Sequence, residues 1–360
     1  MPDLKSTDRH ILYQTLDSID IPATLQRKLA RSGIRIHCAG ATVDLAAFRQ
    51  VRVVAFGKAA FAMASGLSDV LAPDVRPLGI LVTPSPASRP LDGFQMFVAG
   101  HPVPTAQSLA AGRAILDLLV SCVEHTLVFF LLSGGGSALV ELPLDPALTL
   151  DDVQSLHRLL VTCGAPINEI NAVRKHLSAV KGGRLAAAAP LSTKLTFSVS
   201  DVPVGCESAL ASGPTLPDPT TIADALRVIQ RYNLLNKLPP RLRTLLERPA
   251  LVETPKPGDP AFARAYFEIL LDVHDLFHQA HRVAEAAGCV TICDNSTDDW
   301  PLDKAADFLL DQLAQLRQAN PGRRVAVIAD GEVSSPVTGN GTGGRNSAFI
   351  LYCVEKIADK

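Results

Sequence analysis

An unbroken apolar run at residues 127–132 constrains the fold of this 360-residue chain more than any other segment. A strand that is apolar at every position is buried on both faces, and such strands occur in parallel sheets covered by helices on both sides. Similar strand-like runs at residues 51–56, 78–83, 94–99 and 194–199 alternate with helix-like segments. We therefore expect an α/β fold with a doubly wound, mostly parallel sheet of the Rossmann-like kind.

The apolar run ends in a glycine-rich segment made of Ser133, Gly134, Gly135, Gly136 and Ser137. Three consecutive glycines leave their backbone N–H groups open to an anion, and the N-terminus of a following helix would add positive charge. The segment therefore has the composition of a phosphate-binding loop. The alternative is a tight turn that needs glycine for its geometry alone. The segment matches neither the P-loop pattern nor the dinucleotide fingerprint.

Three further residues follow predicted strands, at the edge where open parallel sheets bind ligands. Lys58 follows one strand and Gly57, and its ammonium can reach over a ligand there; the alternative is a solvated lysine on a first helical turn. Asp201 follows another strand, a position that suits a metal ligand or a carboxylate that orients a hydroxyl. His101 lies in a proline-rich turn after a third strand, where it can contact a ligand or only brace the loop.

Two later segments carry cations. Asn171, Lys175, Ser178 and Lys181 recur at roughly helical spacing and should share one polar face of a helix, which is either a solvated surface or a ligand-facing one. Residues 330–346 form a second glycine-rich loop, in which Arg345 can donate charge-assisted hydrogen bonds to a phosphate.

Prolines interrupt all periodicity between residues 238 and 260, which indicates a domain boundary. We expect a first domain at residues 1–240, a linker at 241–259 and a smaller α/β domain at 260–360. That second domain is predicted to begin with a helix that runs to about Ala287.

The composition excludes several classes of protein. The formal net charge is −2 and charged residues make up 19% of the chain, which argues against nucleic acid or an anionic membrane as the main partner. No apolar stretch reaches the length of a membrane span. The seven cysteines form no CxxC pair, so we expect reduced thiols and a cytoplasmic protein. The oligomeric state stays open.

Six segments, each weak alone, occur together in one order. They are Phe56-Gly-Lys-Ala-Ala60, Gly100-His-Pro-Val-Pro104, Leu132-Ser-Gly-Gly-Gly-Ser-Ala138, the Asn-Glu-Ile-Asn and Arg-Lys-His-Leu-Ser run of residues 168–184, Ser200-Asp-Val-Pro203 with Ala211-Ser-Gly-Pro-Thr215, and Gly331-Glu332 with Gly343-Gly-Arg-Asn346. From about residue 10 to its end, the chain resembles the class II glycerate kinases, the glycerate 2-kinase family with a C-terminal domain called MOFRL.

The resemblance implies two α/β domains with a cleft between them and ATP-dependent phosphorylation of D-glycerate at the 2-hydroxyl. It assigns the catalytic cations to Lys58 and Arg345, and the phosphate-binding loop to residues 133–137. Phosphoryl transfer mainly needs positioning and charge neutralisation. We therefore expect further roles in three groups: nucleotide contacts from Asn340, Gly343 and Gly344; Mg²⁺ contacts from Asp201 and Glu332; and glycerate contacts from Asn171, Arg174, Lys175 and Lys181.

The chain departs from the family pattern in three places. Glu207 stands alone where the family usually has an acidic pair, Ser347-Ala348 replaces Gln-Glu, and the chain ends at Lys360, where the family continues. We therefore expect an incomplete MOFRL-like domain. The short C-terminus suggests one alternative, a catalytically impaired binding protein. A second alternative is an NAD(P)H-dependent hydroxypyruvate reductase, a label that some family members carry. The missing Gly-x-Gly-x-x-Gly fingerprint counts against the reductase.

Overall fold

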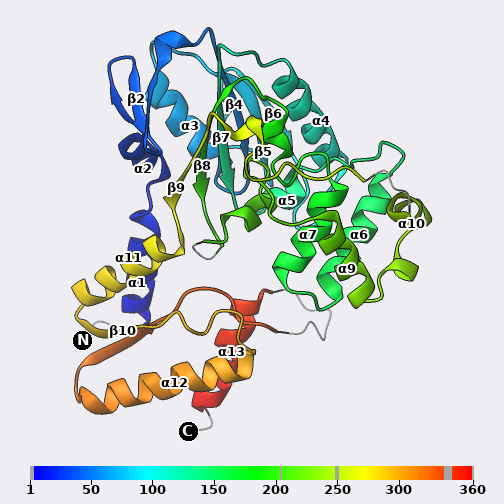
Figure 1. The fold of residues 1–360 in the computed structure, drawn as a ribbon. Helices are drawn as coiled ribbons and strands as arrows, with labels where there is room; N and C mark the ends of the chain where they lie inside the picture. The colour runs from blue at the N-terminus through cyan, green and yellow to red at the C-terminus, as the bar shows by residue number, and fades with distance from the viewer. Residues whose placement is uncertain (1–3, 203–204, 248–250, 336–342, 359–360) are drawn as a thin grey trace. The chain divides into compact units, whose positions relative to one another are not determined.

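The computed structural model describes residues 4–202, 205–247, 251–335 and 343–358 (Figure 1). The chain forms two compact units. The larger unit is Ile21–Asp272, and the smaller unit combines Met1–Asp20 with Val273–Lys360.

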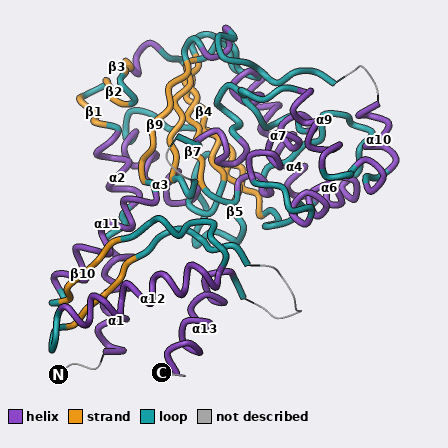
Figure 2. The backbone as a smooth tube through the Cα atoms, turned by 60° about the horizontal axis from the view of Figure 1, so that its bottom comes forward, coloured by secondary structure: helices purple, strands orange, loops and turns teal. Residues whose placement is uncertain are grey.

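A six-stranded parallel sheet forms the centre of the larger unit (Figure 2). Its strands are β4 (Gln50–Phe56), β5 (Leu78–Thr83), β6 (Phe94–Val98), β7 (Thr126–Ser133), β8 (Thr193–Val199) and β9 (Ala265–Leu271). Their order across the sheet is β6-β5-β4-β7-β8-β9, and every neighbouring pair is parallel. This is the strand order of a doubly wound Rossmann-type sheet, so the predicted fold class is confirmed.

The central strand β7 is buried at all eight positions, as its apolar sequence predicted. Phe129 and its odd-numbered neighbours pack into a cluster with α3 (Ala60–Leu71) on one face of the sheet. Phe130 and its even-numbered neighbours pack into a second cluster with α4 (Ala106–Val120) on the other face. Each fully buried large apolar side chain contributes roughly 1.5–3 kcal/mol relative to exposure, so this strand anchors both layers.

The remaining elements of the larger unit surround this sheet. A third apolar cluster joins the helices α6 (Leu150–Thr162), α7 (Ile167–Leu177), α9 (Ile222–Arg231) and α10 (Pro240–Glu247), which lie together in Figure 1. A small antiparallel sheet contains β1 (Ala30–Ser32), β2 (Arg35–Cys38) and β3 (Ala41–Asp44). The other helices are α2 (Ile21–Lys28), α5 (Gly136–Leu139) and α8 (Arg184–Ala187).

The smaller unit is also of the α/β type. Its parallel strands β10 (Cys289–Cys293) and β11 (Arg324–Ile328) pair along their whole length. Its helices are α1 (Leu4–Asp17), α11 (Val273–Ala286), α12 (Leu302–Ala319) and α13 (Arg345–Ala358). None of the helices in the described ranges combines the length and the apolarity that a bilayer crossing requires.

Two predicted helices are shorter than the sequence suggested. The helix expected from residue 260 to Ala287 begins only at Val273, because residues 265–271 pair with β8 as the edge strand β9. The compact units consequently divide near Asp272, whereas the sequence suggested a linker at 241–259. The helix expected to carry Lys181 ends at Leu177, because Ser178 is extended and pairs with Pro143 in a β-bridge.

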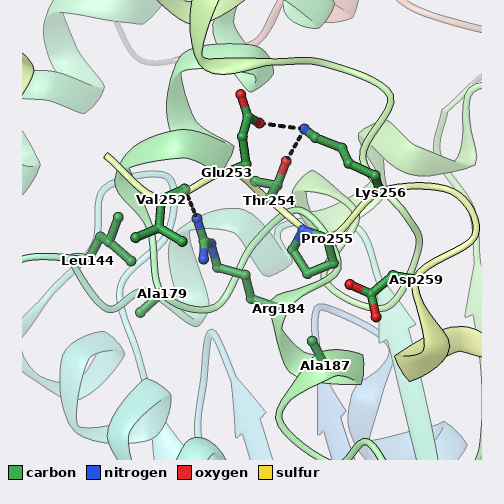
Figure 3. Close-up of a pocket in the computed structure, with 10 residues that line it drawn as sticks. All are labelled: Leu144, Ala179, Arg184, Ala187, Val252, Glu253, Thr254, Pro255, Lys256 and Asp259. Atoms are coloured by element: carbon green, nitrogen blue, oxygen red, sulfur yellow. Dashed lines mark hydrogen bonds and ion pairs between the residues drawn. The ribbon is translucent and has the colours of Figure 1, made fainter. Parts of the chain in front are cut away.

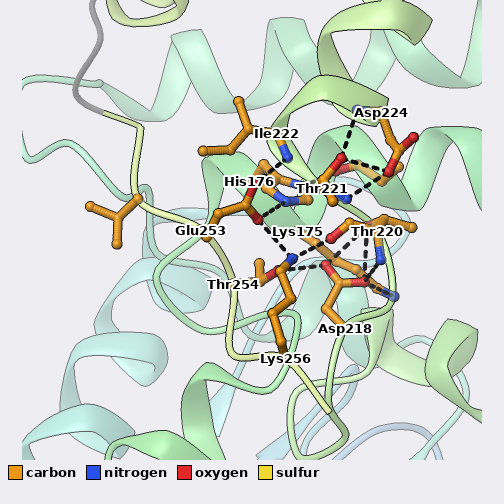
Figure 4. Close-up of polar contacts among 12 residues, drawn as sticks. Lys175, His176, Asp218, Thr220, Thr221, Ile222, Asp224, Glu253, Thr254 and Lys256 are labelled. Atoms are coloured by element: carbon orange, nitrogen blue, oxygen red, sulfur yellow. Dashed lines mark hydrogen bonds and ion pairs between the residues drawn. The ribbon is translucent and has the colours of Figure 1, made fainter. Parts of the chain in front are cut away.

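A buried polar cluster joins the segment around Thr254 to α7 and to the loop before α9 (Figure 4). Asp218 is fully buried and lies 3.2 Å from the ammonium of Lys175, which is also buried. Asp218 also accepts hydrogen bonds from the hydroxyls of Thr220 and Thr254. The carboxylate thus connects three segments that are distant in the sequence.

Burial alone would raise the pKa of the Asp218 carboxyl, but Lys175 and the two threonines outweigh burial and lower the pKa. A carboxyl whose pKa is lowered by folding stabilises the protein above its ordinary pKa of about 3.9. That contribution is lost as the pH falls.

We expect Asp218→Ala to lower the free energy of unfolding by about 3–5 kcal/mol, because it leaves the Lys175 ammonium buried and unpaired. Asp307→Ala, which breaks an exposed pair with Lys356, is the matched control and should cost little, because exposed ion pairs contribute little to stability. Urea unfolding at pH 7 measures both. The cost of Asp218→Ala should shrink below about pH 3.9, and equal costs for the two variants would contradict a structural role for the buried pair.

Candidate active site

The strand order reverses between β4 and β7, because the chain proceeds outward from β4 through β5 and β6 and then returns to start β7 on the other side. The carboxyl ends of two strands at such a reversal diverge into crossovers on opposite faces, and open α/β sheets bind ligands in the crevice that results. The turn after β4 contains Gly57 and Lys58, and the turn after β7 contains Gly134 and Gly135. We call these two turns the switch-point loops.

The switch-point loops are locked to each other by their backbones. The Lys58 N–H donates to the carbonyl of Gly134 at 3.0 Å, and the Ala59 N–H donates to the hydroxyl of Ser133 at 2.9 Å. Gly57 has a φ of +125°, and a Cβ there would lie 2.1 Å from the Ser133 hydroxyl oxygen. Glycine at 57 is therefore needed both for backbone conformation and for close approach. The buried Ser133 is a structural link between the two loops.

Three polar side chains from three different loops converge on Gly134 and Gly135. A Cβ on Gly134 would lie 2.0 Å from a carboxylate oxygen of Asp201, which follows β8. A Cβ on Gly135 would lie 2.9 Å from Cδ2 and 3.1 Å from Nε2 of His101, which follows β6. The same position is 3.6 Å from Cε of Lys58. A cation, an acid and an imidazole thus meet over two glycines at the switch point.

The sequence left two alternatives for His101, contact with a ligand or bracing of its turn, and the structure places its ring over Gly135. The position of His101 in the sequence could have indicated a role in the site, because His101, Lys58 and Asp201 all follow parallel strands of one sheet. Burial and the neighbouring Lys58 lower the pKa of the His101 imidazole, and Asp201 partly opposes them.

The rest of the glycine-rich segment serves packing. A Cβ on Gly136 would lie 2.7 Å from Cβ of Ala211 and 3.0 Å from the ring of Phe56, so this glycine allows close contact inside the protein. The hydroxyl of Ser137 lies 2.8 Å from that of Ser212. The helix that follows, α5, has only four residues, so the positive helix end that the sequence suggested amounts to a single turn.

A buried charge cluster lies directly after α5. Glu141 accepts a hydrogen bond from Ser178 at 2.6 Å, pairs with the ammonium of Lys181, and lies 3.2 Å from Nε2 of His157. Burial alone would raise the pKa of the Glu141 carboxyl, but Lys181 and His157 outweigh it and hold the pKa well below its ordinary value. Lys181 is therefore neutralised by an internal partner.

The four residues predicted to bind glycerate lie among these buried contacts. Lys175 pairs with Asp218 and Lys181 pairs with Glu141, and both lysines are buried. Asn171 is buried and accepts a hydrogen bond from Ser212, which links it to the glycine-rich segment through Ser137. Arg174 is only partly buried and makes no ion pair with any described residue, although its Nε is buried without a hydrogen-bond partner. Of the three predicted cations, Arg174 is therefore the one whose charge no internal partner neutralises.

A surface cavity of about 690 Å³ lies elsewhere in the larger unit (Figure 3). In it, Arg184 donates to the carbonyl of Val252, and Lys256 pairs with Glu253. Lys58, His101 and Asp201 do not line this cavity. Two of its four charged residues pair with each other, and Arg184 and Asp259 each bond to a backbone group, so we assign the candidate site to the switch-point loops instead.

The predicted residues of the smaller unit cluster at the carboxyl end of β11. Arg345 is the first residue of α13, and its guanidinium pairs with Glu332. The next residue, Asn346, donates to the carbonyl of Gly331 at 3.2 Å. Both partners of the ion pair are about half exposed, at 47% and 53%. A Cβ on Gly343 or Gly344 would meet open space, and Asn340 lies outside the described residues.

Comparison with known proteins gives consistent results. A family model described as a domain of unknown function (DUF4147) matches residues 7–247. D-glycerate 2-kinase from Thermotoga maritima is 35% identical over 305 residues, which cover 84% of this chain and 70% of that protein. A putative hydroxypyruvate reductase from Agrobacterium vitis is 36% identical over 303 residues, which cover 83% of this chain and 67% of that protein.

The fold comparison agrees with the sequence comparison. The crystal structure of a glycerate kinase from Thermotoga maritima matches with a TM-score of 0.77 at 30% identity, covering 98% of this chain and 80% of that one. The match extends over both units of the chain. The protein therefore belongs to the DUF4147 family, the class II glycerate kinases.

Proposed function

We propose that this protein is a glycerate 2-kinase that transfers the γ-phosphoryl group of ATP to the 2-hydroxyl of D-glycerate. The observation that carries the proposal is the convergence of Lys58, His101 and Asp201 on Gly134 and Gly135 at the switch point. Phosphoryl transfer needs positioned charge and open backbone N–H groups, and it needs no covalent nucleophile on the protein. The family membership and the names of the relatives support the same reaction.

The residues at the switch point suit Mg²⁺ bound together with a nucleotide. Asp201 is exposed, and its carboxylate makes no hydrogen bond or ion pair with any described residue. Mg²⁺ in nucleotide sites is typically held by one or two carboxylates together with phosphate oxygens. The described residues include no group of three or more His, Cys, Asp or Glu side chains placed to hold a metal without such phosphates. In this proposal Asp201 supplies a carboxylate ligand, and the bound ion supplies positive charge to the phosphates.

Lys58 and Arg345 have complementary roles in the proposal. Lys58 neutralises charge on the transferring phosphoryl group at the switch point, and Arg345, carried by the smaller unit, is the second proposed catalytic cation. Glu332 pairs with Arg345 in the structure, so its part is to hold the guanidinium, with a Mg²⁺ contact as the second possibility. Arg174 is the best of the predicted cations for the glycerate carboxylate, because Lys175 and Lys181 are each paired with a buried carboxylate and Arg174 makes no ion pair with any described residue.

An assay with ATP, Mg²⁺ and D-glycerate tests the function, and ³¹P NMR separates 2-phosphoglycerate from 3-phosphoglycerate. We expect 2-phosphoglycerate and ADP in equal amounts. A parallel assay with NADH and hydroxypyruvate tests the reductase activity named for the Agrobacterium relative. The turn after β4 lacks the dinucleotide fingerprint, so we expect no NADH oxidation.

Gly135→Ala should strongly weaken ATP binding and turnover, because the methyl group would lie 2.9 Å from His101 in the space over the loop. Gly164→Ala is the matched control, since Gly164 has nearly the same φ, +82° against +84°, with nothing within 4 Å of its Cβ position. Both variants should lose about 1–2 kcal/mol of stability from the left-handed backbone. Calorimetric ATP titration and thermal unfolding measure ATP affinity and stability, and an equal loss of ATP affinity in the two variants would contradict the loop's role.

Lys58→Ala and Arg345→Ala should each lower kcat by about 10²-fold or more, the typical effect of removing one preorganised charge donor. If both cations act on one phosphoryl group, the double variant should be worse than either single variant but better than the product of their effects. Arg345→Lys should rescue poorly if the guanidinium binds in a bidentate manner.

Alanine at the exposed Lys237 is the control for general loss of positive charge, and it should leave kcat unchanged. Steady-state kinetics with both substrates provide the measurement. Near wild-type turnover in Lys58→Ala would contradict the mechanism in which both cations are catalytic.

A further inference from the structure

We infer that His101 is the general base that removes the proton from the substrate hydroxyl as that hydroxyl attacks the phosphoryl group. This inference rests on the proposed kinase function and adds a role that the sequence motifs did not assign. It starts from geometry, because the Cδ2–Nε2 edge of the imidazole faces Gly135, with Nε2 only 3.1 Å from the position of a Cβ on that residue.

The turn that carries His101 is held in place by its own contacts. The Ala99 N–H donates to the carbonyl of Thr83, and the Gly100 N–H donates to the hydroxyl of Thr105 at 3.1 Å. Thr105 and Ser108 form the capping box at the start of α4. These contacts join the turn to the strand before it and the helix after it. The imidazole itself makes no hydrogen bond with any described residue, so both ring nitrogens remain available to a ligand.

The surroundings of His101 favour the neutral imidazole that a base requires. Burial and the Lys58 ammonium lower the pKa of the imidazole from its ordinary value of about 6.5, and Asp201 partly opposes them. These are the charged groups from the turns after β4 and β8 that act on the ring. A base whose pKa lies just below the working pH is unprotonated and still accepts a proton efficiently.

The proposed step balances in atoms and charge. The hydroxyl proton passes to Nε2 of His101 while the hydroxyl oxygen forms a bond to the γ-phosphorus of ATP. The bond from that phosphorus to the β–γ bridging oxygen breaks, and its electron pair leaves with ADP. The imidazolium then releases its proton to solvent. Lys58 contributes twice, since it neutralises the phosphoryl oxygens and favours the neutral form of the base.

The first test does not depend on turnover. An NMR titration of the His101 imidazole should give a pKa below 6.5 in the wild-type protein, and Lys58→Met should raise it because a repelling cation is lost. A pKa that does not move in Lys58→Met would overturn the inference, because the juxtaposition with Lys58 would then be absent in solution.

The second test is kinetic. His101→Asn should lower kcat by about 10²–10⁴-fold, the usual contribution of a general base, with little change in ATP affinity. The acidic limb of the wild-type profile of kcat/KM against pH should disappear in this variant. Asparagine keeps a similar size and polarity, so a merely structural role of His101 would leave the limb in place.

His125→Asn is the matched control, because His125 is an exposed histidine directly before the amino end of β7, at the opposite edge of the sheet. It should leave both kcat and the pH profile unchanged. Retention of the acidic limb in His101→Asn would overturn the role of this residue while leaving the kinase function in place. Failure of the wild-type protein to phosphorylate glycerate would overturn the proposed function itself, and the role of His101 with it.

Discussion

The parallel pairing of β4 with β7 is the contact on which the candidate site depends. Seven residue pairs, from Gln50 with Thr126 to Phe56 with Leu132, fix the register of the two strands. Because this register ends both strands at the same level, Gly57 meets Ser133 and the Lys58 backbone reaches Gly134. A slip of one residue would turn the side chains of one strand to the opposite face and separate the loops. Burial on both faces of β7 makes such a slip costly.

The charged residues of the larger unit fall into a structural group and a functional group. Asp218 with Lys175, and Glu141 with Lys181, are internal pairs that bind loops and helices together. Breaking such a pair lowers the stability of the protein strongly. Because each charge is already compensated by its partner, a ligand would gain little binding energy from it. Lys58, Asp201 and the partly buried His101 remain open to solvent, and they approach one another over glycines that leave room for an anion. The distinction rests on whether each charge already has a partner.

Much of the fold could be predicted from local patterns. The apolar run at residues 127–132, the strands that end at Phe56 and Thr83, and the helix that begins after Thr105 all lie where the sequence indicated. The strand β9 was missed, because its apolar residues run almost directly into α11 and only the pairing with β8 separates strand from helix. The end of α7 was misplaced, because a β-bridge between Ser178 and Pro143, which are distant in sequence, decides it.

The sequence by itself determined the parallel sheet, the family and the glycine loops, since these depend on residue type and short spacing. Only the tertiary structure decided which cations are available, because Asp218 and Glu141 reach Lys175 and Lys181 from segments about 40 residues away in the chain. The same is true of His101, which approaches Gly135 through the sheet order and not through sequence proximity. Burial and pairing are properties of the folded chain, so the chemistry of each charged residue follows from its neighbours in space.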